Sequence, residues 1–233
     1  MFNANLLNVL AQANNVTNSV ILRYPETVAM SEDRCLMMRF NTSELDAEEF
    51  PEIPLNDSLS DFLRIFKLFN SDERTITFNG NVINIADKSH SVKYITYDKS
   101  LMNAFDLNST QFERTKEVPT IAEFTLTPDD IKAIKDAYAI FRNLDSVIFE
   151  SKDGKFTISL GNTSSFNAQS NTYSVTKECT ELSKDFKVSI GMDKFSRIPS
   201  SSYTIQIKYN SERDKYRIFA QNDIVEMILS CAV

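Results

Sequence analysis

The sequence predicts an α+β protein with far more strand than helix, arranged as two similar domains. Three observations lead to this prediction. An amphipathic helix followed by a β-hairpin occurs four times along the chain. The apolar positions of two copies correspond at one constant offset. The chain is also 42% apolar and has 17 phenylalanines among its 233 residues, enough to fill a core in each domain.

The clearest helix-plus-hairpin unit begins at Ser58. Positions i, i+3, i+4 and i+7 of a helix share a face, so an apolar stripe at that spacing predicts a buried side. In "SLSDFLRIFKLFN" this buried face is predicted to contain Leu59, Phe62, Leu63 and Phe66. Two alternating runs then flank Asn79-Gly80, a pair that is typical of a tight hairpin turn.

The same unit recurs in the second half of the chain. "TPDDIKAIKDAYAIFRN" predicts a helix, and "SVIFESKDGKFTISL" predicts a hairpin with Asp153-Gly154 at its turn. A chance match of short apolar patterns is the alternative explanation for the repeat. The two helices correspond at an offset of 72 residues (131 − 59), which pairs Leu59, Phe62, Phe66 and Phe69 with Ile131, Ile134, Tyr138 and Phe141.

The two remaining copies are less regular. Near the start, "NANLLNVLAQANN" places Leu6, Leu10 and Ala13 on one helical face, and the strands "SVILRY" and "CLMMRFN" follow it. Near the end, "DFKVSIGMDKFSRIPSSSYTIQIKYNSERDKYRIFAQ" predicts a strand, a short helical turn that stops before Pro199, and a hairpin.

The domain boundary is expected in the polar segment that Pro119 ends. Residues 103–119 are one of the longer segments without a clean helical or strand period. We therefore assign residues 1–108 to an N-terminal domain, 109–119 to a connector and 120–233 to a C-terminal domain.

The predicted helices share a bias in the charge of their outward faces. The formal net charge is −7, yet the centres of these faces carry Lys, Arg or neutral polar residues. Such faces suit a polyanion bound through Coulomb attraction and counterion release, without reading of base sequence. For any single helix, an ordinary solvated face is the alternative. The cationic candidates are Arg64, Lys67, Lys132, Lys135, Arg142, Lys194 and Arg197.

Residues for catalysis, metal binding or cofactor binding are not grouped in the sequence. The four glycines form no phosphate-binding fingerprint, and the three cysteines have no paired spacing. Asp87, Ser89 and His90 are neighbours, but a catalytic triad is assembled in space, so we expect a surface loop there. We expect no enzyme activity, no metal and no cofactor. A hydrolase that uses scattered carboxylates is the alternative of the enzyme class.

The compartment is predicted from two further absences. The chain has no run of about 18 apolar residues, so we expect no membrane span. Its first residues, "MFNANLLNVLAQANN", lack the positively charged region of a signal peptide. We therefore expect a cytosolic protein.

The order and spacing of the four units resemble DNA polymerase sliding clamps, in particular the processivity factors of tailed bacteriophages. These proteins are related in fold to proliferating cell nuclear antigen. The resemblance covers essentially the whole chain and rests on three stretches: "LLNVLAQANNVTNSVILRYPETVAM", "VPTIAEFTLTPDDIKAIKDAYAI" and "FKVSIGMDKFSRIPSSSYTIQI". It implies the DNA-clamp fold, with two similar domains and a ring-forming subunit.

The resemblance also implies a function and partners. Three copies would form a homotrimeric ring whose helices line a hole that duplex DNA threads, without sequence specificity. An ATP-driven clamp loader would open the ring. The ring would tether the replicative DNA polymerase and, in some phages, late-transcription proteins, in the cytoplasm of an infected bacterial host.

The resemblance implies roles for particular residues. The seven cations above would face DNA. Asn5, Asn8 and Gln12 would be neutral members of the lining, which departs from the basic first helix expected of such a clamp. A partner's short hydrophobic peptide would bind in an apolar groove near the connector. Its candidate residues are Leu101, Met102 and Phe105, which the sequence equally allows in the core.

Two other functions remain open at the level of sequence. A monomeric processivity factor of similar fold would share the same units and the same cations. A non-enzymatic phage structural or interaction protein would explain the repeated architecture but has no use for a shared basic stripe.

Overall fold

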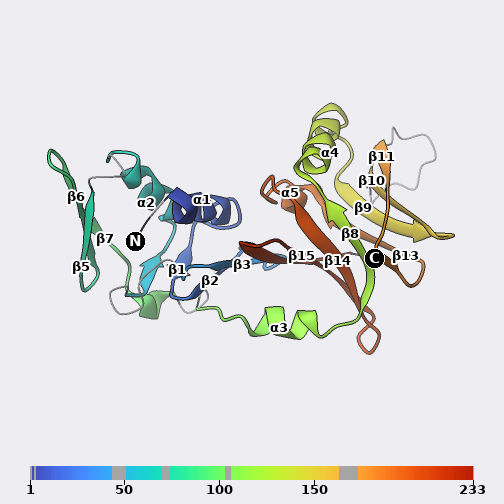
Figure 1. The fold of residues 1–233 in the computed structure, drawn as a ribbon, viewed down its shortest axis with the longest axis horizontal. Coiled ribbons are helices and arrows are strands. Elements are labelled where there is room, and N and C mark those ends of the chain that lie inside the picture. The colour runs from blue at the N-terminus through green and yellow to red at the C-terminus, as the bar shows by residue number, and fades with distance from the viewer. Residues whose placement is uncertain are drawn as a thin grey trace. The chain divides into compact units, whose positions relative to one another are not determined.

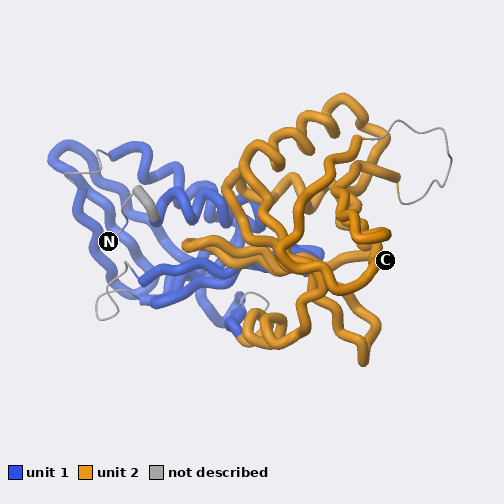
Figure 2. Tube along the Cα trace, turned by 45° about the vertical axis from the view of Figure 1, so that its right-hand side comes forward, with its two compact units in different colours: residues 1–109 blue, residues 110–233 orange. Residues whose placement is uncertain are grey.

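The chain is divided into two compact units, residues 1–109 and residues 110–233 (Figure 2). Figure 1 shows the helices and strands of a computed structural model along the chain. The structure describes residues 2, 4–43, 51–69, 74–102, 106–162 and 173–232.

The described part of unit 1 pairs its strands antiparallel in three groups. Strand β1 pairs with β4, β2 pairs with β3, and β5, β6 and β7 form a three-stranded sheet with β6 at its centre. The elements are α1 (Ala4–Ala13), β1 (Val20–Leu22), β2 (Glu26–Met30), β3 (Leu36–Asn41), β4 (Ile53–Leu55), α2 (Leu59–Phe66), β5 (Thr75–Asn79), β6 (Val82–Ala86), β7 (Ser91–Ile95) and the short 3-10 helix η1 (Lys99–Leu101).

Helices α1 and α2 pack against each other. The core of unit 1 is formed around aromatic side chains of α2. Phe62 and Phe66 have ring centroids 5.0 Å apart, and the ring of Phe2 lies 5.5 Å from Phe62 and 5.0 Å from Phe66. Tyr94 of β7 adds a fourth ring at 5.4 Å from Phe62. Burial of this cluster explains why so short a segment forms a helix, since tertiary packing supplies most of a helix's stability.

The described part of unit 2 contains two antiparallel sheets. One has the order β12-β8-β14-β15-β16, and the other has the order β11-β10-β9-β13. The elements are α3 (Thr110–Lys116), β8 (Thr120–Leu126), α4 (Pro128–Ile140), β9 (Ser146–Lys152), β10 (Lys155–Gly161), β11 (Tyr173–Lys177), β12 (Glu181–Leu182), β13 (Phe186–Gly191), α5 (Met192–Phe195), β14 (Tyr203–Asn210), β15 (Lys215–Gln221) and β16 (Val225–Ser230).

The helices of unit 2 cover its sheets. Helix α4 packs on β10, and α5 packs on β9 and β13 (Figure 1). Helix α3 contacts β15 and β16. Phe124 of β8 lies between the two sheets, with its ring 4.6 Å from that of Phe156 and 6.0 Å from that of Phe149. Unit 2 therefore has an aromatic core of its own.

The hairpin between β9 and β10 is confirmed at the predicted turn. Asp153 has φ +52° and Gly154 has φ +75°, and a type I′ turn requires positive φ at both central residues. The hairpin between β5 and β6 is also confirmed, and Gly80 has φ +58° at its turn. Glycine adopts this conformation without the steric cost that a Cβ atom brings.

One prediction about the elements was wrong. The strand "SVILRY" does not pair with "CLMMRFN": β1 pairs with β4, and β2 pairs with β3. The segment assigned to the connector contains α3, which buries Phe112 and Thr115. Among the described residues, no helix is both long and apolar enough to cross a bilayer.

Candidate nucleic-acid interface

Helix α2 presents two cations opposite its buried face. Leu59, Phe62 and Phe66 are buried, whereas Arg64 and Lys67 are exposed. Arg64 Nη1 lies 3.3 Å from Asp61 Oδ1, and both side chains are largely exposed, so this pair contributes little to stability. Both cations of α2 are accessible to a ligand.

Leu63 differs from its prediction. It was expected on the buried face of α2, but it is only half-buried. It lies beside α1, where it lines a groove that also includes Ala11. An apolar side chain is thus left partly accessible next to the cations of α2.

Helix α1 contributes neutral polar groups. Asn8 is exposed and Gln12 is half-buried, while the side chain of Asn5 lies outside the described residues. The predicted buried face of this helix is confirmed, since Leu6, Leu10 and Ala13 are all buried.

The two lysines of α4 are in different environments. Lys132 is exposed and forms an ion pair with Asp136 one turn further on; the hydrogen bond to that carboxylate raises the pKa of Lys132. Lys135 is half-buried and donates from Nζ to the carbonyl oxygen of Ile198 at 2.9 Å. Burial lowers the pKa of Lys135. Lys132 is therefore the more accessible of the two.

The remaining cationic candidates lie at or beyond helix ends. Arg142 is exposed and follows the last residue of α4 by two positions. Lys194 is a half-buried residue of the single turn α5, and Arg197 is half-buried just after it. Lys135 bonds to the carbonyl of Ile198, the residue that follows Arg197 in the sequence. One lysine of α4 therefore lies beside the segment that follows α5.

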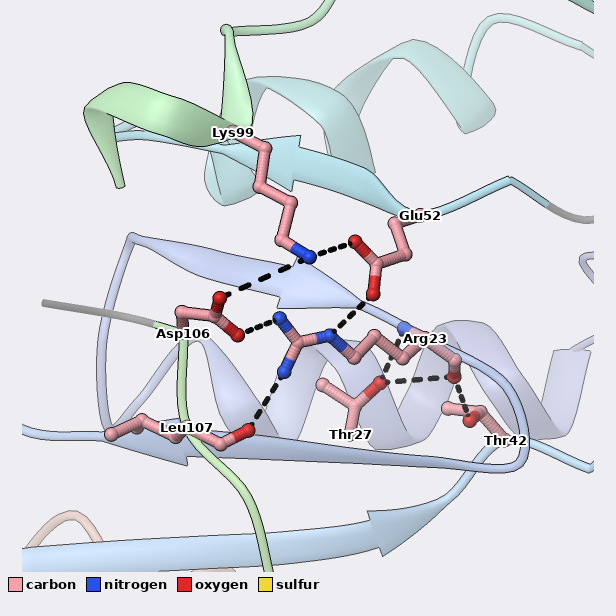
Figure 3. Close-up of polar contacts among 7 residues, drawn as sticks. All are labelled: Arg23, Thr27, Thr42, Glu52, Lys99, Asp106 and Leu107. Atoms are coloured by element: carbon pink, nitrogen blue, oxygen red, sulfur yellow. Dashed lines mark hydrogen bonds and ion pairs between the residues drawn. The ribbon is translucent and has the colours of Figure 1, made fainter. Parts of the chain in front are cut away.

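A charge network in unit 1 links Arg23 to Lys99, which precedes the candidate Leu101 by two positions (Figure 3). Arg23 donates from Nε to Glu52 at 2.9 Å, from Nη1 to the carbonyl oxygen of Leu107 at 2.7 Å, and from Nη2 to Asp106. Lys99 Nζ lies 2.6 Å from Glu52 and 3.9 Å from Asp106. Each carboxylate therefore contacts both cations, and Lys99, Asp106 and Leu107 are joined to the segment just after β1.

Two threonines hold the backbone of Arg23 in this network. Thr27 Oγ1 accepts a hydrogen bond from the Arg23 amide at 2.9 Å, and Thr42 Oγ1 donates to the Arg23 carbonyl (Figure 3). Partial burial acts to raise the pKa of Glu52. The hydrogen bond from Lys99 and the charge of Arg23 outweigh it, so the pKa of Glu52 is lowered.

The three partner-binding candidates have different positions. Leu101 is 76% exposed at the end of η1, whereas Met102 is 1% exposed and belongs to the core. Phe105 lies outside the described residues. Of the two described candidates, Leu101 is thus the one that a partner could reach. The Arg23 network could not be predicted from any local pattern, because its members come from separate segments.

The neighbours Asp87 and His90 form a turn between β6 and β7. Asp87 Oδ1 accepts from the backbone amides of Ser89 at 2.8 Å and His90 at 2.7 Å. The Asp87 carboxylate thus accepts hydrogen bonds from two backbone amides of the turn. The pKa of Asp87 is lowered, and the bond from the Ser89 amide is the largest cause. Within the described ranges, no group of three or more His, Cys, Asp or Glu side chains could hold a metal ion.

Comparison with known proteins gives a clear result for the fold. No family model matches the chain, and no curated protein sequence matches it. Solved structures do match. The PCNA of A. fulgidus, solved with the C-terminal region of FEN-1, gives a TM-score of 0.67 at 15% identity over 98% of this chain and 95% of that one. PCNA from Entamoeba histolytica gives 0.64 at 12% identity, over 97% and 94%.

A bacterial clamp matches over a smaller share of its own length. The Helicobacter pylori beta clamp bound to a DNA ligase peptide gives a TM-score of 0.63 at 10% identity, over 98% of this chain but 64% of that chain. The chain thus spans nearly the full length of the PCNA chains and less than two thirds of this beta clamp. It has the DNA-clamp fold, and the predicted fold class is confirmed.

Proposed function

We propose that the protein is a sliding clamp. Three copies form a ring that encloses duplex DNA and tethers a replicative DNA polymerase, which raises processivity. The observation that carries this proposal is the likeness of nearly the whole chain to PCNA and beta clamps. The exposed cations of α2 and α4 support it, because they suit weak contacts with the phosphate backbone.

In the proposed mechanism, the time that the ring stays on DNA does not depend on its affinity for DNA. Enclosure keeps the ring on DNA without tight contacts. The contacts themselves are exposed charges, and these are screened over about 8 Å at physiological salt. Contacts of this kind hold the duplex without stalling movement, and they read no base sequence.

The proposal extends to partners. One PCNA neighbour was solved with the C-terminal region of FEN-1, and the Helicobacter pylori clamp with a DNA ligase peptide. We propose that this chain binds a short peptide of its polymerase near the segment that carries Leu101. We also propose that a clamp loader opens the ring and that the ring binds late-transcription proteins. We propose further that the protein comes from a bacteriophage and acts in the cytoplasm of the bacterial host.

Retention on DNA tests the proposed function directly. The protein is loaded on nicked circular duplex by its cognate loader, and the DNA is then separated from free protein at high salt. A clamp remains on the circle and is lost when the circle is cut with a restriction enzyme. Equal loss from circular and linear DNA contradicts enclosure and favours an ordinary DNA-binding or interaction protein.

A further inference from the structure

Strands β5, β6 and β7 of unit 1 correspond to β14, β15 and β16 of unit 2 (Figure 1). In each unit the three strands follow a helix, α2 or α5, and pair antiparallel in chain order. In unit 2 a further strand, β8, pairs with β14 on the side away from β15. Among the described strands of unit 1, none pairs with β5 on the side away from β6. The sheet of unit 1 therefore has an open edge at the position where the sheet of unit 2 has a strand.

Phe2 shows which part of β8 has a counterpart in unit 1. Leu126, the last residue of β8, precedes the first residue of α4 by two positions (128 − 126) and lies opposite Tyr203. Phe2 likewise precedes the first residue of α1 by two positions (4 − 2), and its carbonyl oxygen accepts a hydrogen bond from Arg74, just before β5. Both Phe2 and Leu126 are buried. Phe2 thus corresponds to Leu126, and Arg74 to Tyr203.

The inward side chains of β5 are less buried than their counterparts in unit 2. Ile76 corresponds to Ile205 at an offset of 129 (205 − 76), and Ile205 is buried opposite Phe124 of β8. At the same offset, Phe78 corresponds to the buried Ile207 (207 − 78). Ile76 and Phe78 are only half-buried, and no residue of β5 is buried. An added strand in the position of β8 would cover them.

The backbone of β5 offers hydrogen-bonding groups at this edge. Gly80-Asn81 is a two-residue turn, so Asn79 and Val82 beside it occupy a hydrogen-bonded pair position. Such positions alternate along an antiparallel ladder, and the N–H and C=O groups of Ile76 therefore point away from β6. An edge that presents such groups is a template for the pairing of another strand.

The composition of β5 and of β8 indicates which segment would fit. Residues 74–81 include one cation, Arg74, and no acid, which favours a neutral or acidic segment. The outward side chains of β5 are exposed and neutral: Thr75, Thr77 and Asn79. At the equivalent place in unit 2, β8 has the sequence "TIAEFTL", with Phe124 buried and Glu123 half-buried. Alternation of apolar and polar side chains is thus the pattern that suits this position.

We propose that the open edge of β5 binds an extended segment of a partner protein, which joins the sheet as an antiparallel strand. The segment has apolar side chains at alternate positions and no net positive charge, as β8 does. Main-chain hydrogen bonds supply the affinity, and the half-buried Ile76 and Phe78 select apolar side chains. The site shares no residue with the peptide site proposed near Leu101, and it lies at the edge of the sheet opposite β7. It goes beyond the proposed function and does not depend on it.

A short peptide tests the proposal. The probe is a fluorescent peptide with the sequence of residues 120–125, TIAEFT, which has the pattern of β8 and leaves the place of Phe2 unoccupied. Its affinity for the intact protein is measured by anisotropy. In the register of β8, the phenylalanine of the peptide lies opposite Ile76, so its amide faces β5 and the amide of the preceding glutamate faces away.

Methylation of single peptide amides separates strand addition from other binding. N-methylation of the phenylalanine is expected to weaken binding about ten-fold or more, because it removes a donor at the edge and places a methyl group against β5. N-methylation of the glutamate is the matched control. Its affinity should stay within about two-fold of the unmodified peptide, because that amide makes no bond to β5.

Amide hydrogen exchange locates the bound peptide. The amide of Ile76 is expected to exchange rapidly in the free protein and slowly in the presence of the peptide, because strand addition gives it an acceptor. Exchange over β7 and β11 should not change on addition of the peptide. These two strands also have a neighbour on one side only among the described residues, so they serve as the control edges.

Four results overturn the proposal. The first is no binding of the TIAEFT peptide at millimolar concentration, and the second is equal affinity of the two N-methylated peptides. The third is protection over β7 or β11 in place of β5. The fourth is slow exchange of the Ile76 amide in the free protein, which would show that another part of this chain or a second copy occupies the edge. Retention on circular DNA tests the proposed function separately, and none of these four results bears on it.

Discussion

The side chain of Arg23 makes three polar contacts with separate segments of unit 1. Its planar guanidinium donates to two carboxylates and one carbonyl, an arrangement that the compact ammonium of lysine cannot reproduce. The side chain is 19% exposed, so its partners are only partly screened by water. Arg23→Lys keeps the charge and is nevertheless expected to lower the free energy of unfolding of unit 1 by about 1–2 kcal/mol.

Acid is expected to weaken the same network. The folded-state pKa of Glu52 lies below its ordinary value of 4.5, so the folded protein binds the proton less readily than the unfolded chain does. Its contribution is therefore fully present above pH 4.5 and is lost as the pH falls through the lower, folded-state pKa. In urea unfolding between pH 6 and 3, Glu52→Gln should lose less stability than wild type.

The control for this acid prediction is Glu212→Gln, which removes a carboxylate from an exposed turn of unit 2. That variant should follow the wild-type dependence on pH more closely than Glu52→Gln does. If the stability of wild type and of Glu52→Gln depended on pH in the same way, ionisation of Glu52 would not contribute to the stability of the folded protein.

The lysines of α4 show what could be predicted at the level of residues. The helical period correctly separates Ile131 and Ile134, which are buried, from Lys132, which is exposed. It fails for Lys135, which is half-buried and bonded to the carbonyl of Ile198, a residue 63 positions further along the chain. No local pattern contains that contact, so the accessibility of Lys135 could not be predicted.

Helix α4 begins at a capping box, which determines where the helix starts in the sequence. Thr127 Oγ1 accepts from the Asp130 amide at 3.2 Å, and Asp130 Oδ2 accepts from the Thr127 amide at 2.9 Å. Lys177 of β11 lies 2.5 Å from the same carboxylate and ties the helix start to a strand. Partial burial acts to raise the pKa of Asp130, but the bond from Lys177 outweighs it, and the pKa is lowered.

The loss of this cap should be measurable. Thr127→Ala is expected to lower the free energy of unfolding by about 1 kcal/mol, because the amides at the helix start lose an acceptor. Thr127→Ser retains the hydroxyl and is the matched control, expected within about 0.5 kcal/mol of wild type. Urea unfolding followed by circular dichroism compares the three proteins. Equal losses in both variants would indicate that the threonine methyl group, not the cap, stabilises this region.

Elements that are specified by neighbouring residues could be predicted from the sequence. Elements that depend on contacts between distant residues could not. The turn at Asp153-Gly154 is specified by residues that accept positive φ, so the β9–β10 hairpin follows from the sequence. Strand β1 finds its partner 35 positions away, at Val20 opposite Leu55 (55 − 20), and nothing near β1 indicates that pairing. Helix α3 is short and buries two side chains, which is too few to produce a visible period.

At the scale of the whole molecule, the sheet edges indicate how copies could join. Among the described strands, β7 and β11 each have a hydrogen-bonded neighbour on one side only, and an open edge is a template for pairing with another chain. Of the two edges of its sheet, β7 is the one with a large exposed apolar side chain, Ile95, which is 60% exposed. Strand β13, at the far edge from β11, is already bridged at Ser189 to Ala232.

These edges favour a head-to-tail assembly. Strand β7 belongs to unit 1 and β11 to unit 2, so their pairing between copies uses two different surfaces of the chain. An interface of that kind generates a closed ring when the rotation between copies closes. The proposed trimer would therefore be joined by β7 of one copy and β11 of the next.

A charge on the β7 edge should dissociate this ring. Ile95→Glu places an unpaired carboxylate in the proposed interface, where the loss of water makes a charge unfavourable, so light scattering should give the mass of one chain in place of three. Ile140→Glu is the matched control, because Ile140 is 74% exposed at the end of α4 and belongs to neither edge strand, so the mass of this variant should remain that of three chains. A trimer that survives Ile95→Glu would exclude the β7 edge from the interface. A wild-type protein that stays monomeric at high concentration would exclude the ring and favour a monomeric processivity factor.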